Sequence, residues 1–264
     1  MPEVVLLKLG GSLITEKSRR ETARPDVIAR LAGEIARVAG RIPERIVLGH
    51  GSGSFGHMAA QEHGIAGGLR SPGQLPGISR TQERAAALHR EVMSALAAAG
   101  LSPFSIAPSS CFVFAGGRPA ELADEPLRLA LANGLLPVVY GDVVMDREQG
   151  VAIASTERVL VALARLLPKR GLPVHRVLWL GETDGVYDAD GNTIPRLSAE
   201  DFEEASKAIG SPAGTDVTGG MRHRVETALE LARLGIRSVL FNGLTPGLLE
   251  RALLGESVPG TEVS

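Results

Sequence analysis

The sequence has a single cysteine, Cys111, and few aromatic residues: phenylalanine, tryptophan and tyrosine make up 3% of its 264 residues. One cysteine cannot form an internal disulfide, which fits a reducing compartment such as the cytoplasm. So few aromatic side chains leave little with which to stack nucleic acid bases. Lysine and arginine number 28 against 30 aspartate and glutamate residues. The basic excess that is typical of a nucleic-acid-binding protein is therefore absent as well.

Long hydrophobic runs are also absent. No stretch approaches the ~20 apolar residues that a transmembrane helix requires. The N-terminus lacks the basic segment and cleavage site of a signal peptide. Apolar residues nevertheless make up 44% of the chain, which is enough for a sizeable core. We therefore expect a cytoplasmic protein that neither spans nor binds a membrane.

Short apolar runs alternate with segments of helical periodicity along the chain. This alternation is typical of a parallel sheet covered by helices. Strands are expected at residues 4–9, 46–48, 104–107, 136–140, 176–180, 238–241 and 261–263, and helices at residues 26–39, 79–99, 155–167, 221–232 and 246–254, with a further helix beginning at Ser198. Because the sequence has no low-complexity linker and no internal repeat, we expect residues 1–264 to form one domain.

Three of the expected strand ends carry glycine and polar residues: Gly10 to Ser12, His50 to His57, and Gly141 with Asp142. In open α/β sheets, ligands bind beyond the carboxyl ends of the strands. Glycine lets backbone N–H groups approach phosphate oxygens without a Cβ atom in the way. One such loop alone would most simply be a tight turn, but three at successive strand ends indicate an anion site.

Two common phosphate motifs nearly fit these loops. Residues 11–18 read G-S-L-I-T-E-K-S, one residue away from a P-loop, but Glu16 stands where the second glycine is needed and would repel a phosphate. Residues 51–56 read G-S-G-S-F-G and match the dinucleotide fingerprint, which also needs an acidic residue about 20 positions further on. No carboxylate lies between Glu62 and Glu83. The sequence therefore argues against both motifs.

A protein-held metal site is not expected. His50, His57 and His63 are close in the sequence, but their spacings of seven and six residues differ from the i, i+4 spacing of a metal-binding helix. No cysteine or carboxylate cluster joins them.

Five motifs together point to a known family. They are K-L-G-G-S-L-I-T-E-K at Lys8 to Lys17, H-G-S-G-S-F-G-H at His50 to His57, Y-G-D-V-V at Tyr140 to Val144, T-D-G-V-Y at Thr183 to Tyr187 and G-T-D-V-T-G-G-M at Gly214 to Met221. With these motifs the chain resembles the amino acid kinase superfamily and, within it, the isopentenyl phosphate kinases. The resemblance implies a three-layer αβα sandwich around a mainly parallel open sheet, and a homodimer. It also implies an N-terminal lobe that binds the acceptor and a C-terminal lobe that binds ATP with magnesium.

The resemblance assigns roles to the first loop and its two lysines. Lys8, Leu9 and the Gly10–Ser12 backbone would contact the nucleotide and the transferred phosphoryl group. Lys17 would stabilise charge in the transition state. Phosphoryl transfer needs mainly positioning and charge stabilisation, which these groups can supply. Lys8 is also unusual in its own right, because it interrupts an apolar strand and buried lysines are rare unless they are paired.

The second loop and the C-terminal half supply the other implied contacts. Ser52 and His57 would contact the acceptor, and His57 would donate a hydrogen bond to the acceptor's phosphate. The positions implied on the ATP side are Gly53, Glu182, Asp184, Gly220 and Arg224. A phosphate monoester has a second pKa near ~6 and is largely ionised at neutral pH. A phosphate acceptor therefore needs no general base, and His57 can serve as a donor.

Three positions depart from the family pattern. Thr156 and Glu157 stand where Gly-Asp is usual. Glu157 would then orient the phosphate-binding cations with a longer arm, and Thr156 would add bulk beside the acceptor phosphate. Arg224 replaces a usual lysine and offers a planar fork in place of a point donor. Gly181 to Thr183 stands where Thr-Asp-Val is common. Because none of these changes removes a charge, we expect an active enzyme.

These roles predict ATP-dependent phosphorylation of isopentenyl phosphate to isopentenyl diphosphate. Two alternatives remain open. The segment from Ser155 to Val159 resembles the corresponding segment of fosfomycin kinase, which phosphorylates a small phosphonate. A nucleotide-binding storage or sensor protein could keep the fold without turnover, although such a protein has no need of Lys8, Lys17 and His57.

Overall fold

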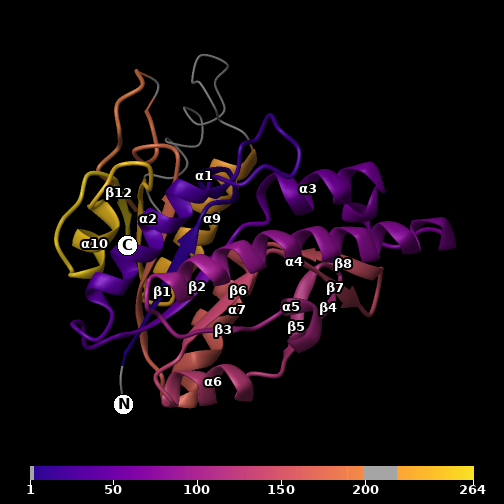
Figure 1. Cartoon of the computed structure of the whole chain (residues 1–264), viewed down its shortest axis with the longest axis horizontal. Coiled ribbons are helices and arrows are strands. Elements are labelled where there is room, and N and C mark those ends of the chain that lie inside the picture. The colour runs from indigo at the N-terminus through magenta and orange to yellow at the C-terminus, as the bar shows by residue number, and fades with distance from the viewer. Residues whose placement is uncertain (1–2, 189, 199–218) are drawn as a thin grey trace.

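The computed structural model describes residues 3–188, 190–198 and 219–264, and Figure 1 gives their arrangement. The helix expected to begin at Ser198, and most of the motif from Gly214 to Met221, lie outside these residues. Within the described ranges, no helix is long and apolar enough to cross a membrane.

In the described part of the chain the main sheet has eight strands, in the order β10-β12-β11-β9-β1-β2-β6-β3. Neighbouring strands run parallel, except that β12 is antiparallel to β11. The strands are β1 (Val4–Leu9), β2 (Arg45–His50), β3 (Pro103–Ser105), β6 (Leu136–Tyr140), β9 (Val174–Gly181), β10 (Arg196–Leu197), β11 (Arg237–Asn242) and β12 (Thr261–Val263). The mainly parallel open sheet predicted from the sequence is therefore confirmed.

Helices cover both faces of this sheet. Val5 and Leu7 of β1 pack into a core with α2 (Pro25–Val38), α4 (Leu75–Ala98) and α10 (Leu248–Leu253). Val4 and Leu6 point to the other face and pack with α6 (Glu125–Ala132), α7 (Thr156–Leu166) and α9 (Gly219–Ala232). Because alternate residues of a strand face opposite sides, the two cores confirm the three-layer αβα sandwich. Trp179 of β9 is 1% exposed in the second core and pairs in register with Lys8 of β1.

A second, four-stranded sheet was not predicted. Its strands, in the order β5-β4-β7-β8, are β4 (Phe112–Ala115), β5 (Arg118–Leu122), β7 (Asp142–Asp146) and β8 (Gly150–Ala154). Each strand has only four or five residues, too few for a clear alternation. Asp146 closes the β7–β8 turn by accepting backbone N–H bonds from Glu148 and Gln149. Figure 1 shows this sheet beside α4.

Two segments expected to be loops are partly helical. Gly11–Ile14 forms the short helix α1, and Gly53–Glu62 forms α3, so the expected loop from His50 to His57 ends at Gly53. Glycine at the start of these segments hid the helices, because glycine is a weak helix former. Within the described ranges, the other short helices are α5 (Pro108–Cys111) and the 3₁₀ turns at Ile65–Gly67, Pro72–Gln74 and Leu167–Arg170.

Candidate active site

The first two glycine loops are in backbone contact with each other. Gly11 follows β1, and Gly51 and Gly53 follow β2. A Cβ atom on Gly11 would lie 2.6 Å from the Gly53 nitrogen, and one on Gly51 would lie 2.7 Å from the Gly11 nitrogen. Gly53 has φ +50°, and its Cβ atom would lie 2.2 Å from the Thr15 hydroxyl oxygen. Glycine is therefore required at this junction, where two backbones meet at the carboxyl edge of the sheet.

Lys8 and Glu157 form a buried ion pair next to this junction. Lys8 is 3% exposed, and its ammonium group donates to Oε1 of Glu157 in the first turn of α7. Burial lowers the pKa of Lys8, although the Glu157 charge opposes this shift. Burial acts to raise the pKa of Glu157, but Lys8 and then Arg224 lower it to about 2. Glu157 is thus ionised at neutral pH, and a buried carboxylate favours the protonated form of the lysine it contacts.

Arg224 of α9 is the second cation near this pair. Its positive charge acts to lower the pKa of both Lys8 and Glu157. In each case the effect of burial is larger, lowering the pKa of Lys8 and raising that of Glu157. Its guanidinium lies over the end of β9, since a Cβ atom on Gly181 would be 3.0 Å from Nη1. The Nε atom is buried and has no hydrogen-bond partner among the described residues. A buried N–H without a partner is costly, so Arg224 has a donor available for an anion.

A cavity of about 540 Å³ lies on the other side of the second glycine loop. Its lining comes from α3, α4, the β7–β8 hairpin and the starts of α7 and α9. The lining residues are Ser52, Gly56, His57, Ala60, Gln61, Ala66, Thr81, Ala85, Gly141, Asp142, Gln149, Ala152, Ile153, Ser155, Arg158 and His223. Alanines and an isoleucine make part of the wall apolar, whereas hydroxyl, amide, imidazole and guanidinium groups supply polar contacts. The lining also includes the buried Asp142 carboxylate, whose oxygens accept from the backbone amides of Ser109 and Val143. This combination suits a small molecule with an apolar part and an anionic part.

His57 is the exposed imidazole on this cavity. Its Nδ1 atom lies 3.1 Å from the Gly53 carbonyl oxygen and 3.4 Å from the Ser52 hydroxyl oxygen. A carbonyl oxygen only accepts, so Nδ1 carries a proton in this contact. Nε2 can then donate to a ligand only when the ring is doubly protonated. The Nδ1 contact therefore leaves Nε2 as the ring nitrogen that can meet a ligand in the cavity.

Thr156 is engaged inside the protein. It is 1% exposed, and its hydroxyl donates to the His50 carbonyl oxygen at 2.7 Å. Its methyl group packs against β2, since a Cβ atom on Gly49 would lie 2.7 Å from Cγ2. Ser155 lines the cavity, and Thr156 does not belong to the lining. The extra bulk expected beside the acceptor thus lies against the sheet, and a direct contact of Thr156 with substrate stays a prediction.

A buried pair of histidines, His50 and His89, packs beneath the second glycine loop on its core side and contacts its backbone through His50. His50 Nδ1 lies 3.1 Å from the Gly51 carbonyl oxygen, and His50 Nε2 lies 2.9 Å from His89 Nδ1. His89 in turn lies 2.8 Å from the Ser105 hydroxyl and stacks on Tyr140 at 4.1 Å between ring centroids. Burial lowers the pKa of His50 to about 4 and, together with the charges of His50 and Arg90, lowers that of His89 to about 3. Both rings are therefore neutral at physiological pH.

The predicted nucleotide-side carboxylates lie just beyond β9. Glu182 accepts a hydrogen bond from Arg24 at 2.8 Å, and the ammonium group of Lys17 lies 4.0 Å away. Asp184 accepts from the amide of Asn242, which ends β11, at 2.9 Å. The two carboxylates are thus held at the same edge of the sheet as the glycine junction.

The other predicted residues are placed as follows. Leu9 is the buried last residue of β1, Ser12 is in α1, and Gly220 is the second residue of α9. The sequence interpretation did not single out Arg158 and His223, which both line the cavity. Their sequence neighbours could have indicated them, because Arg158 directly follows Glu157 in α7 and His223 directly precedes Arg224 in α9.

Known proteins resemble the chain over nearly its whole length. The amino acid kinase family matches residues 3–242. The isopentenyl phosphate kinase of Methanothermobacter thermautotrophicus is 34% identical, and 99% of each chain is covered. That of Haloferax volcanii is 36% identical, and 98% of each chain is covered. An X-ray structure of isopentenyl phosphate kinase has a TM-score of 0.81 at 31% identity, covering 98% of this chain and 100% of the other.

Proposed function

Because the chain belongs to the amino acid kinase family and, within it, to the isopentenyl phosphate kinases, we propose that it transfers the γ-phosphoryl group of ATP to the phosphate of isopentenyl phosphate. The acceptor oxygen bonds to the γ-phosphorus as the bond to the β–γ bridging oxygen breaks, so the products are isopentenyl diphosphate and ADP. The observation that carries this proposal is the cavity beside the glycine junction, where His57 and an apolar wall meet. A short hydrocarbon tail can pack against the apolar wall, and the phosphate can accept a hydrogen bond from the His57 imidazole.

On the acceptor side, His57 and Ser52 hold the phosphate. Its attacking oxygen is largely ionised at neutral pH, since the second pKa of a phosphate monoester is near ~6. No side chain has to remove a proton from the acceptor, so the role left for His57 is to donate a hydrogen bond. The Nδ1 contact with Gly53 orients the ring for this role, with Nε2 as the donating atom.

On the nucleotide side, the cations neutralise charge on the transferred group. Lys8 is kept protonated and oriented by Glu157, and Arg224 brings an Nε donor that has no partner in the part of the chain that the structure describes. The backbone amides of Gly11 and Gly53 approach the phosphate oxygens, whereas the Gly10 amide donates to the Leu180 carbonyl oxygen at 2.8 Å and Gly10 contributes the close approach of its backbone. Lys17 adds charge in the transition state, when the negative charge is spread over the transferred oxygens. Leu9, Ser12, Glu182, Asp184 and Gly220 complete the proposed nucleotide contacts.

Magnesium belongs to the proposal as a companion of ATP. Within residues 3–188, 190–198 and 219–264, no group of three or more His, Cys, Asp or Glu side chains is placed to hold a metal ion. Magnesium keeps several waters and is commonly bound through substrate phosphates. We therefore treat Mg–ATP as the nucleotide substrate.

The proposed organisation is one domain over residues 1–264, with the acceptor lobe N-terminal and the ATP lobe C-terminal. The family resemblance supports a homodimer, and the single cysteine supports a cytoplasmic location. Light scattering of the purified protein tests the first of these, and cell fractionation tests the second.

The decisive experiment is an ATP-coupled assay with magnesium across isopentenyl phosphate, dimethylallyl phosphate, fosfomycin and N-acetylglutamate. We expect the highest kcat/KM for isopentenyl phosphate. A preference for fosfomycin would establish the phosphonate alternative instead. If the protein binds ATP but phosphorylates none of these acceptors, it is a storage or sensor protein. Lys17→Ala separates these cases further, because in a kinase it lowers turnover far more than ATP affinity.

A further inference from the structure

Lys17 lies on a hairpin that crosses from the nucleotide side to the acceptor side. A β-bridge between Thr15 and Ala23 closes its base, and the Glu16 amide donates to the Thr22 carbonyl oxygen at 2.9 Å. We call residues 15–24 the Lys17 hairpin. Among the described residues, its Glu21 is the one non-glycine residue with positive φ, at 47°. This backbone geometry is unfavourable for a residue with a side chain, so other contacts must hold the tip.

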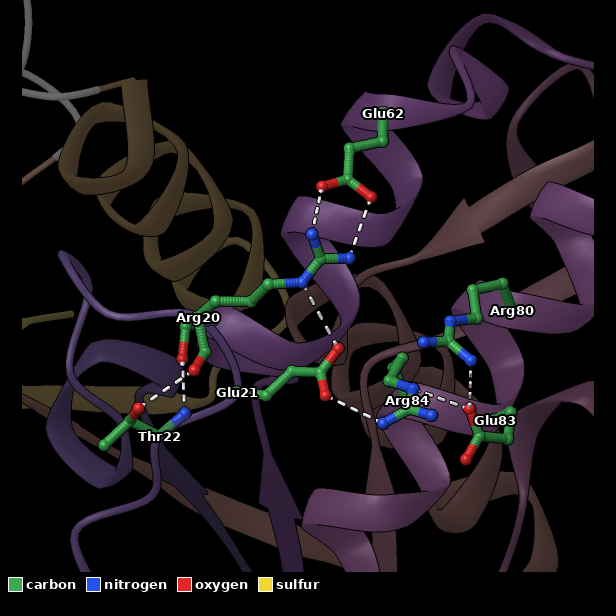
Figure 2. A network of polar contacts seen from close by, with 8 residues as sticks. Arg20, Glu21, Thr22, Glu62, Arg80, Glu83 and Arg84 are labelled. Carbon is green, nitrogen blue, oxygen red and sulfur yellow. Dashed lines mark hydrogen bonds and ion pairs between the residues drawn. The ribbon is translucent and has the colours of Figure 1, made fainter.

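Arginine–glutamate pairs hold the tip against the two acceptor-side helices, as Figure 2 shows. Arg20 donates to both carboxylate oxygens of Glu62 in α3, at 2.7 and 2.9 Å. Glu21 accepts from Arg84 of α4 at 2.7 Å and lies 3.5 Å from Arg20. Glu83 lies 2.6 Å from Arg84. The tip is thus attached to α3, which carries His57, and to α4, which supplies Thr81 and Ala85 to the cavity wall.

The other side of the hairpin is attached to the nucleotide side. Arg24 donates to Glu182 at 2.8 Å, and the ammonium group of Lys17 lies 4.0 Å from the same carboxylate. The hairpin therefore joins residues of the two halves of the proposed site. Its ion pairs remain partly exposed: the side chains of Glu21 and Arg84 are 24% and 22% exposed. They contribute little apolar burial, so their main effect is on where the hairpin lies.

We propose that Glu21 and Arg84 are positioning residues that fix Lys17 over the reaction centre. This inference rests on the proposed kinase function. Ion pairs near the protein surface contribute only ~0–1 kcal/mol to folding, and Glu21 and Arg84, at 24% and 22% exposure, lie near the buried end of that class. Orientation has a larger effect on a reaction, because a misplacement of about 1 Å can lower the rate ~100-fold. Loss of the Glu21–Arg84 contact should therefore lower turnover more than it lowers stability.

The kinetic test compares Arg84→Met with Arg80→Met in the wild-type protein and in a Lys17→Ala background. Arg80 lies on the same helix, 3.8 Å from Glu83, and does not contact the hairpin in Figure 2. We expect Arg84→Met to lower kcat about tenfold, well within the ~100-fold limit for misplacement, with little change in the KM for ATP. Arg80→Met should leave kcat unchanged. The Lys17→Ala/Arg84→Met double variant should be no slower than Lys17→Ala, because Arg84 acts through Lys17.

Two kinetic outcomes would overturn the proposal. One is an unchanged kcat in Arg84→Met, and another is a further tenfold loss when it is added to Lys17→Ala. Glu21→Gln keeps the size of the side chain and should reproduce Arg84→Met, which preserves the test if Arg84→Met does not fold. Arg84→Lys should recover part of the lost kcat, because it retains the charge without the planar guanidinium that lies between Glu21 and Glu83.

A second measurement does not depend on turnover. Trypsin can cleave the hairpin after Lys17, Arg19 or Arg20, and mass spectrometry identifies the fragments. We expect Arg84→Met and Glu21→Gln to speed this cleavage several-fold, because local opening limits proteolysis of a folded segment. Arg80→Met should be cleaved like wild type. Equal rates in all variants would reject the positioning role, whereas faster cleavage in a protein without kinase activity would reject only the proposed function.

Discussion

The Lys8–Glu157 pair and the ion pairs of the Lys17 hairpin use the same chemistry in opposite environments. Lys8 and Glu157 have side chains that are 4% and 14% exposed. Arg20 and Glu62, at the hairpin tip, are 49% and 43% exposed. The first pair lies between a strand and a helix of the core, and the second joins a loop to a helix end. Burial decides what each pair can contribute.

Inside the protein, removing one partner leaves the other charge without compensation. At the surface, water and salt compensate most of the loss. We therefore expect the buried pair to be essential for both folding and catalysis, and to respond to pH. The hairpin pairs should matter mainly for geometry, and should respond to salt.

The largest effect is expected from Glu157→Gln. It leaves Lys8 buried beside a neutral amide, which should lower the free energy of unfolding by about 3–5 kcal/mol. It should also lower kcat about 100-fold, since a misdirected cation no longer stabilises the transferred charge. Urea denaturation and the coupled assay measure the two effects. Glu83→Gln is the exposed control, and an equal loss of stability in both variants would contradict the contrast with the surface pairs.

The next largest effect is the pH dependence of stability, which tests the buried ionisable groups. The pKa values of His50 and His89 are lowered from 6.5 to about 4 and about 3. A histidine whose pKa is lower in the folded protein binds a proton more readily when the protein is unfolded. As pH falls below the unfolded pKa, protonation therefore favours the unfolded state. Stability should therefore decrease below pH 6.5, by up to about 1.4 kcal/mol per pH unit for each histidine. The Glu157 contribution should be lost only between about pH 4.5 and 2.

Urea midpoints at several pH values between 6.5 and 4.5 test this assignment. His89→Gln should flatten the decline, because one neutral-held histidine is gone. Glu157→Gln should keep the decline, since its carboxyl titrates at lower pH. A wild-type midpoint that stays constant across this range would show that the two rings are not held neutral.

The smallest effect is expected at the hairpin. Arg84→Met should lower the free energy of unfolding by no more than about 1 kcal/mol, as for other partly exposed pairs. The difference from wild type should shrink in ~1 M salt, where the Debye length is about 3 Å. Chemical denaturation with urea, which adds no charge, measures it at low and high sodium chloride. A difference that persists in high salt would mean that Arg84 stabilises through packing.

Sequence patterns predicted the main sheet and its helices well, because a buried parallel strand and an amphipathic helix each leave a continuous signal. Residues 4–9 and 261–263 coincide with β1 and β12. The small sheet left no such signal: β4 shares only the Phe114–Asp146 pair with β7. That contact joins residues far apart in the sequence and depends on the fold already formed.

The candidate site was predictable where family motifs carry it and not elsewhere. Lys8 and Glu157 were both named from the sequence, and the structure brings them into contact across 149 positions. The same information did not reveal the hairpin pairs. Glu62 and Arg84 are ordinary surface residues in sequence terms, and only the path of residues 15–24 places charges beside them. The family pattern placed Thr156 beside the acceptor, which stays a prediction, and only the structure reveals that its hydroxyl donates to the His50 carbonyl oxygen.

The position of Trp179 gives the protein an optical reporter of its own. Trp179 is the single tryptophan of the chain and is buried in register with Lys8 on the neighbouring strand. Its indole Nε1 has no hydrogen-bond partner among the described residues. Emission from such an indole reports unfolding by a shift to longer wavelength.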